Sequence, residues 1–192
     1  MVRVLETPHC QSSTMTLEKH TYALFGNRTL HVGYYTDVKN SQALRQGLLD
    51  KKFDVALINA HLIAGPFQIH AAASRALLCD ASSRLTTRSL HAELVFNMSG
   101  SRNVSESFKR FGVNDDTTSL VVCVVDADDE TLKEVETLVE GMQVPFEELG
   151  THLTDGDIKL IKKFYKISEQ ELKQSSLVDA ATCRIATKSC SK

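Results

Sequence analysis

The sequence has few of the residues that interrupt or disorder a chain, with three prolines and nine glycines among 192 residues. This scarcity excludes a collagen-like chain and argues against a long disordered segment. Long apolar runs are missing too. The longest one, Leu120–Val125, is the length of a strand and falls far short of the roughly 18 residues of a membrane span. We therefore expect one globular domain that makes no use of a membrane.

Motifs that carry chemistry are equally scarce. The five cysteines include no CxxC pair, and none of the seven histidines has a His or Cys partner at metal-ligand spacing. The phosphate loop GxxxxGK[ST], the dinucleotide fingerprint GxGxxG and the nucleophile elbow GxSxG do not occur. The acidic groups Asp126–Glu130 and Asp155–Asp157 fit a helix start and a turn better than a carboxylate site. We therefore expect no enzyme, no cofactor, no metal and no small-molecule substrate.

The N-terminal residues lack the continuous apolar segment of a secretory signal. We therefore expect a protein of the cytoplasm and nucleus. In that reducing compartment most cysteines are expected to be small hydrophobic residues rather than disulfide partners.

The net charge of −2 hides an uneven distribution. Residues 114–158 hold one basic and 13 acidic side chains, whereas residues 84–113 hold five basic and two acidic ones, and residues 159–192 hold eight and three. A solvated acidic helix face accounts for the first segment. The alternative is that acidic surface is kept apart from basic surface, so that a polyanion is held in one orientation.

Apolar periodicity predicts a mixed α/β fold in one domain, with a small mixed or antiparallel sheet, several helices and a helical C-terminal half. We assign residues 1–15 to an extension and residues 16–192 to the domain. Strands are predicted in a hairpin around Gly26-Asn27, and over residues 53–58 and 119–125. Helices are predicted after Asn40 and Gly65, and over residues 90–98, 103–111, 129–141, 154–165 and 176–188.

The best organised stretch is Thr86–Val113. It contains two amphipathic segments joined by a short turn, Ser99–Arg102, with arginines before the first segment and within the turn. Asn103 is placed to cap the second helix, with Glu106 three residues on. Because this stretch is so regular and holds no catalytic pair, it indicates a protein that binds rather than one that catalyses.

Several motifs together resemble the PRPK-binding protein family, the small subunit of the KEOPS/EKC complex. The resemblance covers about residues 19–188, and it rests on the number and order of the motifs rather than on any single one. The motifs are DVKN at 37–40, ALINA at 56–60, PFQIHAAASRA at 66–76, LTTRSLHAELVFNMSGSRNVSESFKRFGV at 85–113, FYKISEQEL at 164–172 and LVDAATCRIATK at 177–188. The extension has no counterpart in the family, and His61 stands where many relatives have proline.

This resemblance implies a non-catalytic partner of a small atypical kinase/ATPase subunit. Members of the family bind and stimulate that subunit in an assembly that makes threonylcarbamoyladenosine in ANN-decoding tRNAs. They also help to hold tRNA through its single-stranded CCA end. For this chain the implied partners are therefore the kinase-like subunit and tRNA.

The residues proposed for RNA contact are basic and lie in or beside the best organised stretch. Arg88 and Arg102 flank its first helix, and guanidinium groups bind phosphates or stack on bases. Lys109 and Arg110 extend this patch, with Arg84 as a further candidate. The alternative is that Arg88 and Arg102 are an exposed pair that only aids solubility.

For the kinase-like partner we expect the last helix to supply the surface. Its apolar side holds Leu177, Ala181 and Ile185, with Arg184 and Lys188 beside them. The alternative is that this apolar side completes the domain core. Two other functions stay open at this point: an interaction scaffold without RNA contact, and a small enzyme whose site is assembled from scattered His and Asp residues.

Overall fold

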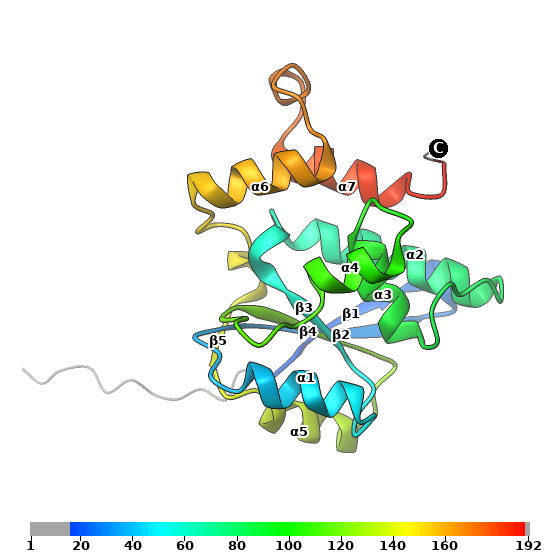
Figure 1. The fold of residues 1–192 in the computed structure, drawn as a ribbon. Coiled ribbons are helices and arrows are strands. Elements are labelled where there is room, and N and C mark those ends of the chain that lie inside the picture. Colours follow the sequence, from blue (N-terminus) through cyan, green and yellow to red (C-terminus); the bar gives the residue numbers. More distant parts are fainter. Residues whose placement is uncertain (1–15, 191–192) are drawn as a thin grey trace, which may run out of the picture.

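The computed structural model of the chain describes residues 16–190, and in them helices cover both faces of a five-stranded sheet (Figure 1). The expected N-terminal extension lies outside this range. The mixed α/β fold is confirmed. The elements in chain order are β1 (Glu18–Tyr22), η1 (Ala23–Phe25), β2 (Arg28–Thr36), α1 (Ser41–Leu49), β3 (Ala56–Asn59), η2 (Ala60–Leu62), α2 (Pro66–Ala81), α3 (Leu90–Met98), α4 (Val104–Phe111), β4 (Leu120–Val125), α5 (Asp129–Leu138), β5 (Met142–Val144), η3 (Phe146–Glu148), α6 (Asp155–Tyr165), η4 (Glu171–Lys173) and α7 (Leu177–Ala186).

All described strand pairs of the sheet are antiparallel, in the order β1-β2-β4-β3. β5 pairs with Tyr34–Thr36, the end of β2 that lies beyond its pairing with β1. The predicted hairpin is present between β1 and β2. Its turn holds Gly26 at φ 70° and Asn27 at φ 61°, and two consecutive positive φ values suit the twist of a tight hairpin.

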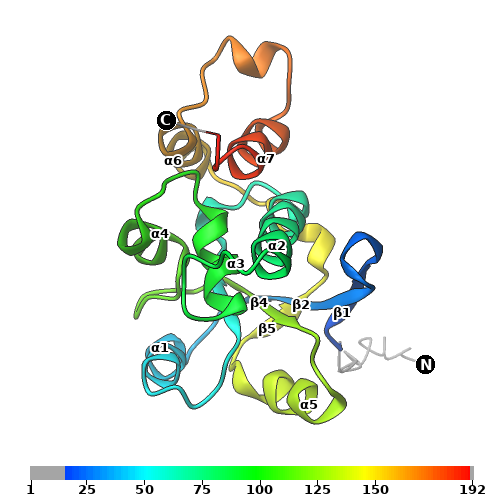
Figure 2. The same ribbon diagram turned by 90° about the vertical axis from the view of Figure 1, so that its right-hand side faces the viewer.

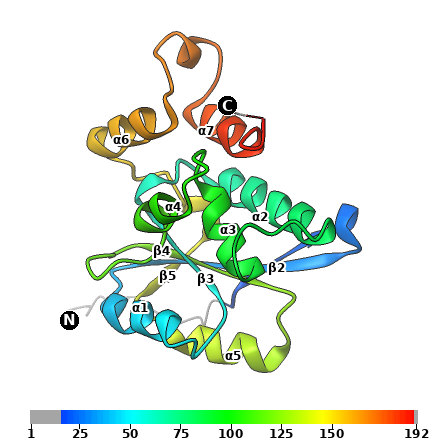
Figure 3. The same cartoon turned by 45° about the vertical axis from the view of Figure 1, so that its right-hand side comes forward.

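The central strand β4 separates two cores. Leu120, Val122 and Val124 belong to the core under α1 and α5, whereas Val121 and Cys123 belong to the core under α2 and α3. Figure 3 shows α1 and α5 on one side of the sheet and the remaining helices on the other. Because both faces are covered, β4 is a continuous apolar run rather than an alternating one.

α6 and α7 form an outer layer on the side of α2 and α3 that faces away from the sheet (Figure 2). Tyr165, the last residue of α6, ties this layer to the helices beneath it. Its buried hydroxyl donates to the Met98 carbonyl oxygen at 2.6 Å and accepts from Gln68 Nε2 at 3.2 Å. Burial raises the pKa of Tyr165, so the hydroxyl keeps the proton that it donates.

The acidic helix ends earlier than predicted, at Leu138 instead of Gly141, and β5 follows it. The Asn40 side chain stops the helix, because its Nδ2 donates to the Leu138 carbonyl oxygen at 2.9 Å and its Oδ1 accepts from the Glu140 amide at 3.1 Å. The chain then approaches β2 so closely that a Cβ at Gly141 would lie 2.9 Å from the Thr36 carbonyl oxygen. A glycine is therefore needed where β5 begins.

The helices predicted within Thr86–Val113 are confirmed as α3 and α4. The last helix is confirmed as well, since the Ser176 hydroxyl accepts from the Asp179 amide at 3.1 Å and caps α7. Among residues 16–190, every helix falls short of the length or the apolar content that spanning a bilayer requires.

Candidate nucleic-acid interface

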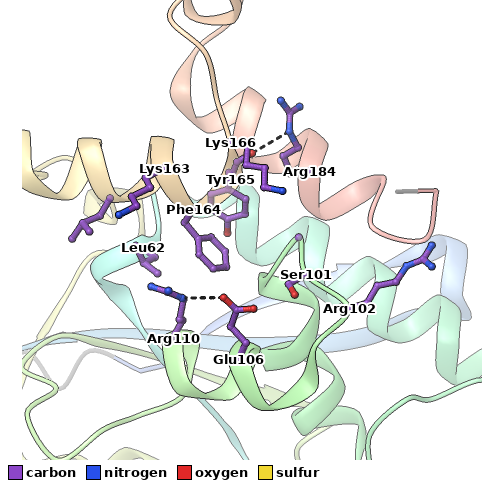
Figure 4. A pocket seen from close by; sticks show the side chains of 12 residues that line it. Leu62, Ser101, Arg102, Glu106, Arg110, Lys163, Phe164, Tyr165, Lys166 and Arg184 are labelled. Carbon is purple, nitrogen blue, oxygen red and sulfur yellow. Dashed lines mark hydrogen bonds and ion pairs between the residues drawn. The ribbon is translucent and has the colours of Figure 1, made fainter. Parts of the chain in front are cut away.

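A cavity of about 750 Å³ opens where α4, α6 and α7 meet the turn that follows α3. Its lining includes five cationic side chains but a single acidic one, Glu106. Figure 4 shows Arg110, Lys163 and Lys166 near the ring of Phe164, whereas Arg102 and Arg184 lie farther from it. We call this site the basic cavity. Its cationic residues are Arg102, Arg110, Lys163, Lys166 and Arg184.

α4 brings Arg110 to the rim of the cavity. The predicted cap holds the start of this helix, because Asn103 Oδ1 accepts from the Glu106 amide at 3.1 Å. One turn on, Arg110 Nε lies 3.6 Å from Glu106 Oε1. Both side chains are about half exposed, so this pair is weak and leaves the guanidinium available to a ligand.

α6 supplies the aromatic part of the cavity. The half-buried ring of Phe164 lies 5.3 Å from the ring of Phe111 and 5.0 Å from that of Tyr165, which fixes its orientation. Arg110 Cζ lies 5.3 Å from the centroid of Phe164. Lys163 and Lys166 flank this ring along the chain. An aromatic face beside guanidinium and ammonium groups is the combination that single-stranded nucleic acids bind, through stacked bases and neutralised phosphates.

The residues predicted to contact RNA fall into two groups. Arg102 and Arg110 line the basic cavity, but Arg84, Arg88 and Lys109 do not. Arg84 and Arg88 are exposed in the loop before α3, and Lys109 is exposed on α4. Arg88 precedes and Arg102 follows α3, whose nine residues span about 13 Å. The cavity therefore does not unite that pair, and RNA contact at all five residues stays a prediction.

The apolar side of α7 lies inside the domain. Ala181 and Ile185 are fully buried in the core, and Leu177 packs against it. Contact with another protein needs accessible side chains. Ala181 and Ile185 therefore complete the core of this chain, which was the alternative to a partner-binding surface, while Leu177 stays partly exposed at its edge.

The two basic residues predicted on the same helix differ in accessibility. Arg184 is partly exposed at the basic cavity, where its Nη2 donates to Glu171 Oε2 at 2.8 Å. Lys188 is only 3% exposed, and its ammonium group donates to the Phe96 carbonyl oxygen. Of the two basic residues, Arg184 is therefore the one that a partner can reach.

Sequence reasoning missed Lys163, Phe164 and Lys166 as site residues. The signal was the short run Lys162–Lys166, KKFYK, in which lysines flank two aromatic residues. Read as part of a helix, this run showed an apolar stripe. The structure shows that the exposed side of this run faces α4 across the basic cavity, which the sequence did not reveal.

The acidic groups have structural roles. Asp128 Oδ1 accepts from the Thr131 amide at 2.8 Å and caps α5, and Asp157 closes the capping box of α6 with Thr154. Burial raises the pKa of Asp126, but hydrogen bonds from Thr29 and Arg28 outweigh it and leave that pKa lowered. Within residues 16–190, no three His, Cys, Asp or Glu side chains gather as a metal site.

Comparison with known proteins identifies the family. The family model described as kinase binding protein CGI-121 matches residues 35–189, a range that includes the whole lining of the basic cavity. The EKC/KEOPS complex subunit TPRKB of Danio rerio is 36% identical over 86% of this chain and 94% of its own length. The EKC/KEOPS complex subunits of Aspergillus fumigatus and Yarrowia lipolytica are 36% and 33% identical, over 82% and 73% of this chain and 90% and 81% of their own lengths. The resemblance inferred from the motifs is confirmed, and the chain belongs to the CGI-121 family of kinase-binding proteins.

Proposed function

We propose that this chain is a non-catalytic subunit of an EKC/KEOPS complex that binds and stimulates the kinase-like ATPase subunit. In the same assembly it helps to hold the single-stranded CCA end of tRNA while threonylcarbamoyladenosine is formed in ANN-decoding tRNAs. It is located in the cytoplasm and nucleus. The observation that carries the RNA part is the basic cavity, in which Phe164 and Arg110 stand side by side among further cations.

The charge of the cavity supports an RNA ligand. Arg184 is paired with Glu171 and Arg110 lies beside Glu106, but Arg102, Lys163 and Lys166 still leave a local excess of positive charge in a chain whose net charge is −2. α5, with its acidic first turn, lies on the opposite side of the sheet (Figure 3). A polyanion is therefore attracted to one face of the molecule and repelled from the other.

The shape of the site supports a single strand rather than a duplex. A half-buried phenylalanine can stack only on a base that is free of its neighbours, and single-stranded ends offer such bases. At about 750 Å³, the cavity suits one or a few nucleotides. The unpaired 3′ end of a tRNA offers such free bases and is short enough for this cavity.

The kinase-like partner needs an accessible apolar surface, and α2 offers one. Phe67 and Leu78 are 57% and 55% exposed. They are eleven residues apart, which places them on the same side of a helix. α2 also packs against α7, whose Arg184 stays accessible. We therefore include the exposed side of α2, together with Arg184, in the partner-binding surface.

Binding of tRNA by the purified chain, measured by fluorescence anisotropy at low salt, tests the RNA part. The double variant Arg110→Glu with Lys163→Glu should weaken binding at least tenfold, because two attractive charges become repulsive. Lys133→Glu with Arg45→Glu, an equal charge change on α5 and α1, is the control and should change affinity little. A tRNA that lacks its CCA end should bind the native chain as weakly as intact tRNA binds the double variant.

The double variant Arg88→Glu with Arg102→Glu locates the RNA within the patch. If the basic cavity holds the strand, Arg102→Glu alone should account for most of the loss. Equal affinity of all the charge variants and the native protein would refute RNA contact at this face.

Co-purification from cells tests the partner. A small kinase-like protein that travels with the chain together with tRNA supports the proposal. The kinase without tRNA supports a scaffold that makes no RNA contact. Turnover of a metabolite by the purified chain would support an enzyme instead.

Substitutions then locate the partner-binding surface. Phe67→Glu and Arg184→Glu should each release the kinase-like protein, whereas Leu49→Glu, which is also exposed but lies on α1, should not. Retention of the partner by both variants would contradict this surface.

A further inference from the structure

A second cavity, of about 360 Å³, lies between α2, α3 and the end of α7. Three cationic side chains line it: Arg75, Arg102 and Lys188. Arg102 lines the basic cavity as well, and Figure 4 shows its side chain directed away from Arg110, toward the end of α7. The function proposed above makes no use of Arg75, Asn97 or Lys188.

The charge in this cavity is only partly balanced. Glu93 is the acidic residue of the lining, and it is 1% exposed. Its Oε2 is already occupied, because it accepts from the Thr86 and Thr87 amides at 2.9 and 2.8 Å and from the Thr87 hydroxyl at 2.8 Å. With Lys188 protonated, three positive charges face one negative charge in a confined space.

The cavity also holds unused hydrogen-bond donors. Asn97 is 1% exposed, and its Nδ2 has no partner among the described residues. The same holds for Arg75 Nε, although Arg75 Nη1 donates to the Ala186 carbonyl oxygen at 2.9 Å. Arg102 Nη2 donates to the Ser189 carbonyl oxygen at 3.0 Å, and the other N–H groups of its guanidinium are left to bind a ligand. Buried donors without acceptors are costly, so their presence together in one lining indicates a missing acceptor.

We propose that this second cavity is a binding site for a phosphate group. A tetrahedral oxyanion offers several acceptor atoms to donors that converge from different directions, and it accepts strongly from guanidinium groups. The donors here come from α2, from α3 and from the turn before α4, so they surround a central volume. The acceptor is an anion rather than water because the lining carries an excess of positive charge.

Lys188 couples the binding of this anion to a proton. Burial above all, and then the charge of Arg75, lower the pKa of Lys188 to about 7, although Glu93 and Cys79 act in the opposite direction. Its ammonium group is held against the ring of Phe96, 3.1 Å from the ring centroid, and at the Phe96 carbonyl oxygen. An anion in the cavity stabilises the charged form, so binding takes up a proton above pH 7. The titratable and charged groups around Lys188 are Arg75, Cys79, Glu93 and Arg102.

Titration calorimetry of the full chain with inorganic phosphate tests the site. One phosphate should bind saturably, and Arg75→Gln and Lys188→Met should each weaken binding at least tenfold. Arg45→Gln removes an equal charge from the far side of the sheet, where Arg45 pairs with Asp115, and should leave phosphate affinity unchanged. Should Lys188→Met not fold, Arg75→Gln carries the test, since Arg75 is partly exposed at the end of this cavity.

Sulfate, which stays doubly charged throughout, measures the pH dependence without titration of the ligand. Its affinity should fall at least tenfold from about pH 6 to about pH 9, and Lys188→Met should remove most of this fall. Absence of saturable binding of both anions, or an equal loss in Arg45→Gln, would overturn the proposal. So would a pH profile that Lys188→Met leaves unchanged.

The phosphate group has two sources, and competition separates them. If inorganic phosphate displaces a single-stranded RNA oligonucleotide and both lose affinity in Arg75→Gln, the site holds a phosphate group of RNA. If inorganic phosphate binds without displacing the oligonucleotide, it holds a free phosphate. Arg75 and Lys188 line only the second cavity and Arg110 and Lys163 only the basic cavity, so failure here is distinguishable from failure of the tRNA proposal.

Discussion

Two buried tyrosines show how much depends on a single hydroxyl group. The Tyr165 hydroxyl joins α6 to α3 and α2 through Met98 and Gln68. Tyr35 is 3% exposed, and its hydroxyl has no partner among the described residues. Replacing tyrosine with phenylalanine therefore removes two hydrogen bonds at position 165, but at position 35 it removes a hydroxyl that has no hydrogen-bond partner.

For Tyr165→Phe we expect the free energy of unfolding to fall by about 1–3 kcal/mol, because a buried carbonyl oxygen and a buried amide lose their partner. Tyr35→Phe is the matched control and should leave stability unchanged or raise it slightly. Urea unfolding of both variants at one pH measures the difference. Equal destabilisation by the two substitutions would show that ring packing, and not the hydroxyl of Tyr165, holds the outer layer.

Lys188 makes stability depend on pH even without a ligand. Its pKa is about 7 in the folded chain and 10.5 when unperturbed. Between these values the unfolded chain binds more protons than the folded one, so the free energy of unfolding rises with pH, by up to about 1 kcal/mol per pH unit. Well below pH 7 both states hold the proton and this slope disappears.

The comparison with Lys188→Met isolates that contribution, because all other titrating groups are shared. Between pH 7 and 9, the free energy of unfolding of the native protein should rise relative to that of the variant, as measured by urea unfolding. Parallel stability curves for the two proteins would contradict the lowered pKa of Lys188.

At the scale of elements, α4 depends on its first turn. It has eight residues, a length at which an isolated helix is not stable, so the cap and the packed face both matter. The Asn103 side chain accepts from the Glu106 amide and satisfies one of the free donors of that turn.

Asn103→Ala should therefore cost about 1 kcal/mol of the free energy of unfolding. Ser105→Ala, an exposed substitution in the same turn, should change it by less than about 0.5 kcal/mol. Thermal unfolding of the two variants under identical conditions is the measurement. A larger loss in Ser105→Ala than in Asn103→Ala would contradict the role of the cap.

α4 and β4 were predictable because their signals are local. Asn103 caps α4, Phe108 and Phe111 form its stripe and Gly112 ends it, all within ten residues. β5 was missed because three residues carry no periodicity. It is a strand only because Tyr34–Thr36, more than 100 residues earlier in the chain, offers an unpaired edge.

The candidate site was only partly predictable for a related reason. Arg110 and Phe164 are 54 residues apart, and their proximity follows from the docking of α6 rather than from either segment. Periodicity likewise showed that α7 has an apolar side but not what covers it. Because Ala181 and Ile185 are buried, the core of the same chain covers this side.

At the scale of the whole molecule, the uneven charge of the sequence becomes an uneven charge of the two sides. The basic cavity lies in the outer helices, whereas α5 lies beyond the sheet (Figures 1 and 3). Most of the acidic residues of α5 are exposed, which agrees with a solvated acidic helix face. The position of α5 also agrees with the alternative, in which acidic surface is kept apart from basic surface so that a polyanion binds in one orientation.

The salt dependence of RNA binding reports how many phosphates this arrangement contacts. If about three phosphates of a single strand are neutralised, the slope of log affinity against log salt should be about −2. Arg110→Gln or Lys163→Gln should each reduce it by about 0.7, since each removes one contact. Lys133→Gln on α5 should leave the slope unchanged while altering the net charge equally. A slope near zero would mean that bound RNA displaces no counterions at the cavity, and an equal reduction in all three variants would assign the attraction to net charge rather than to these residues.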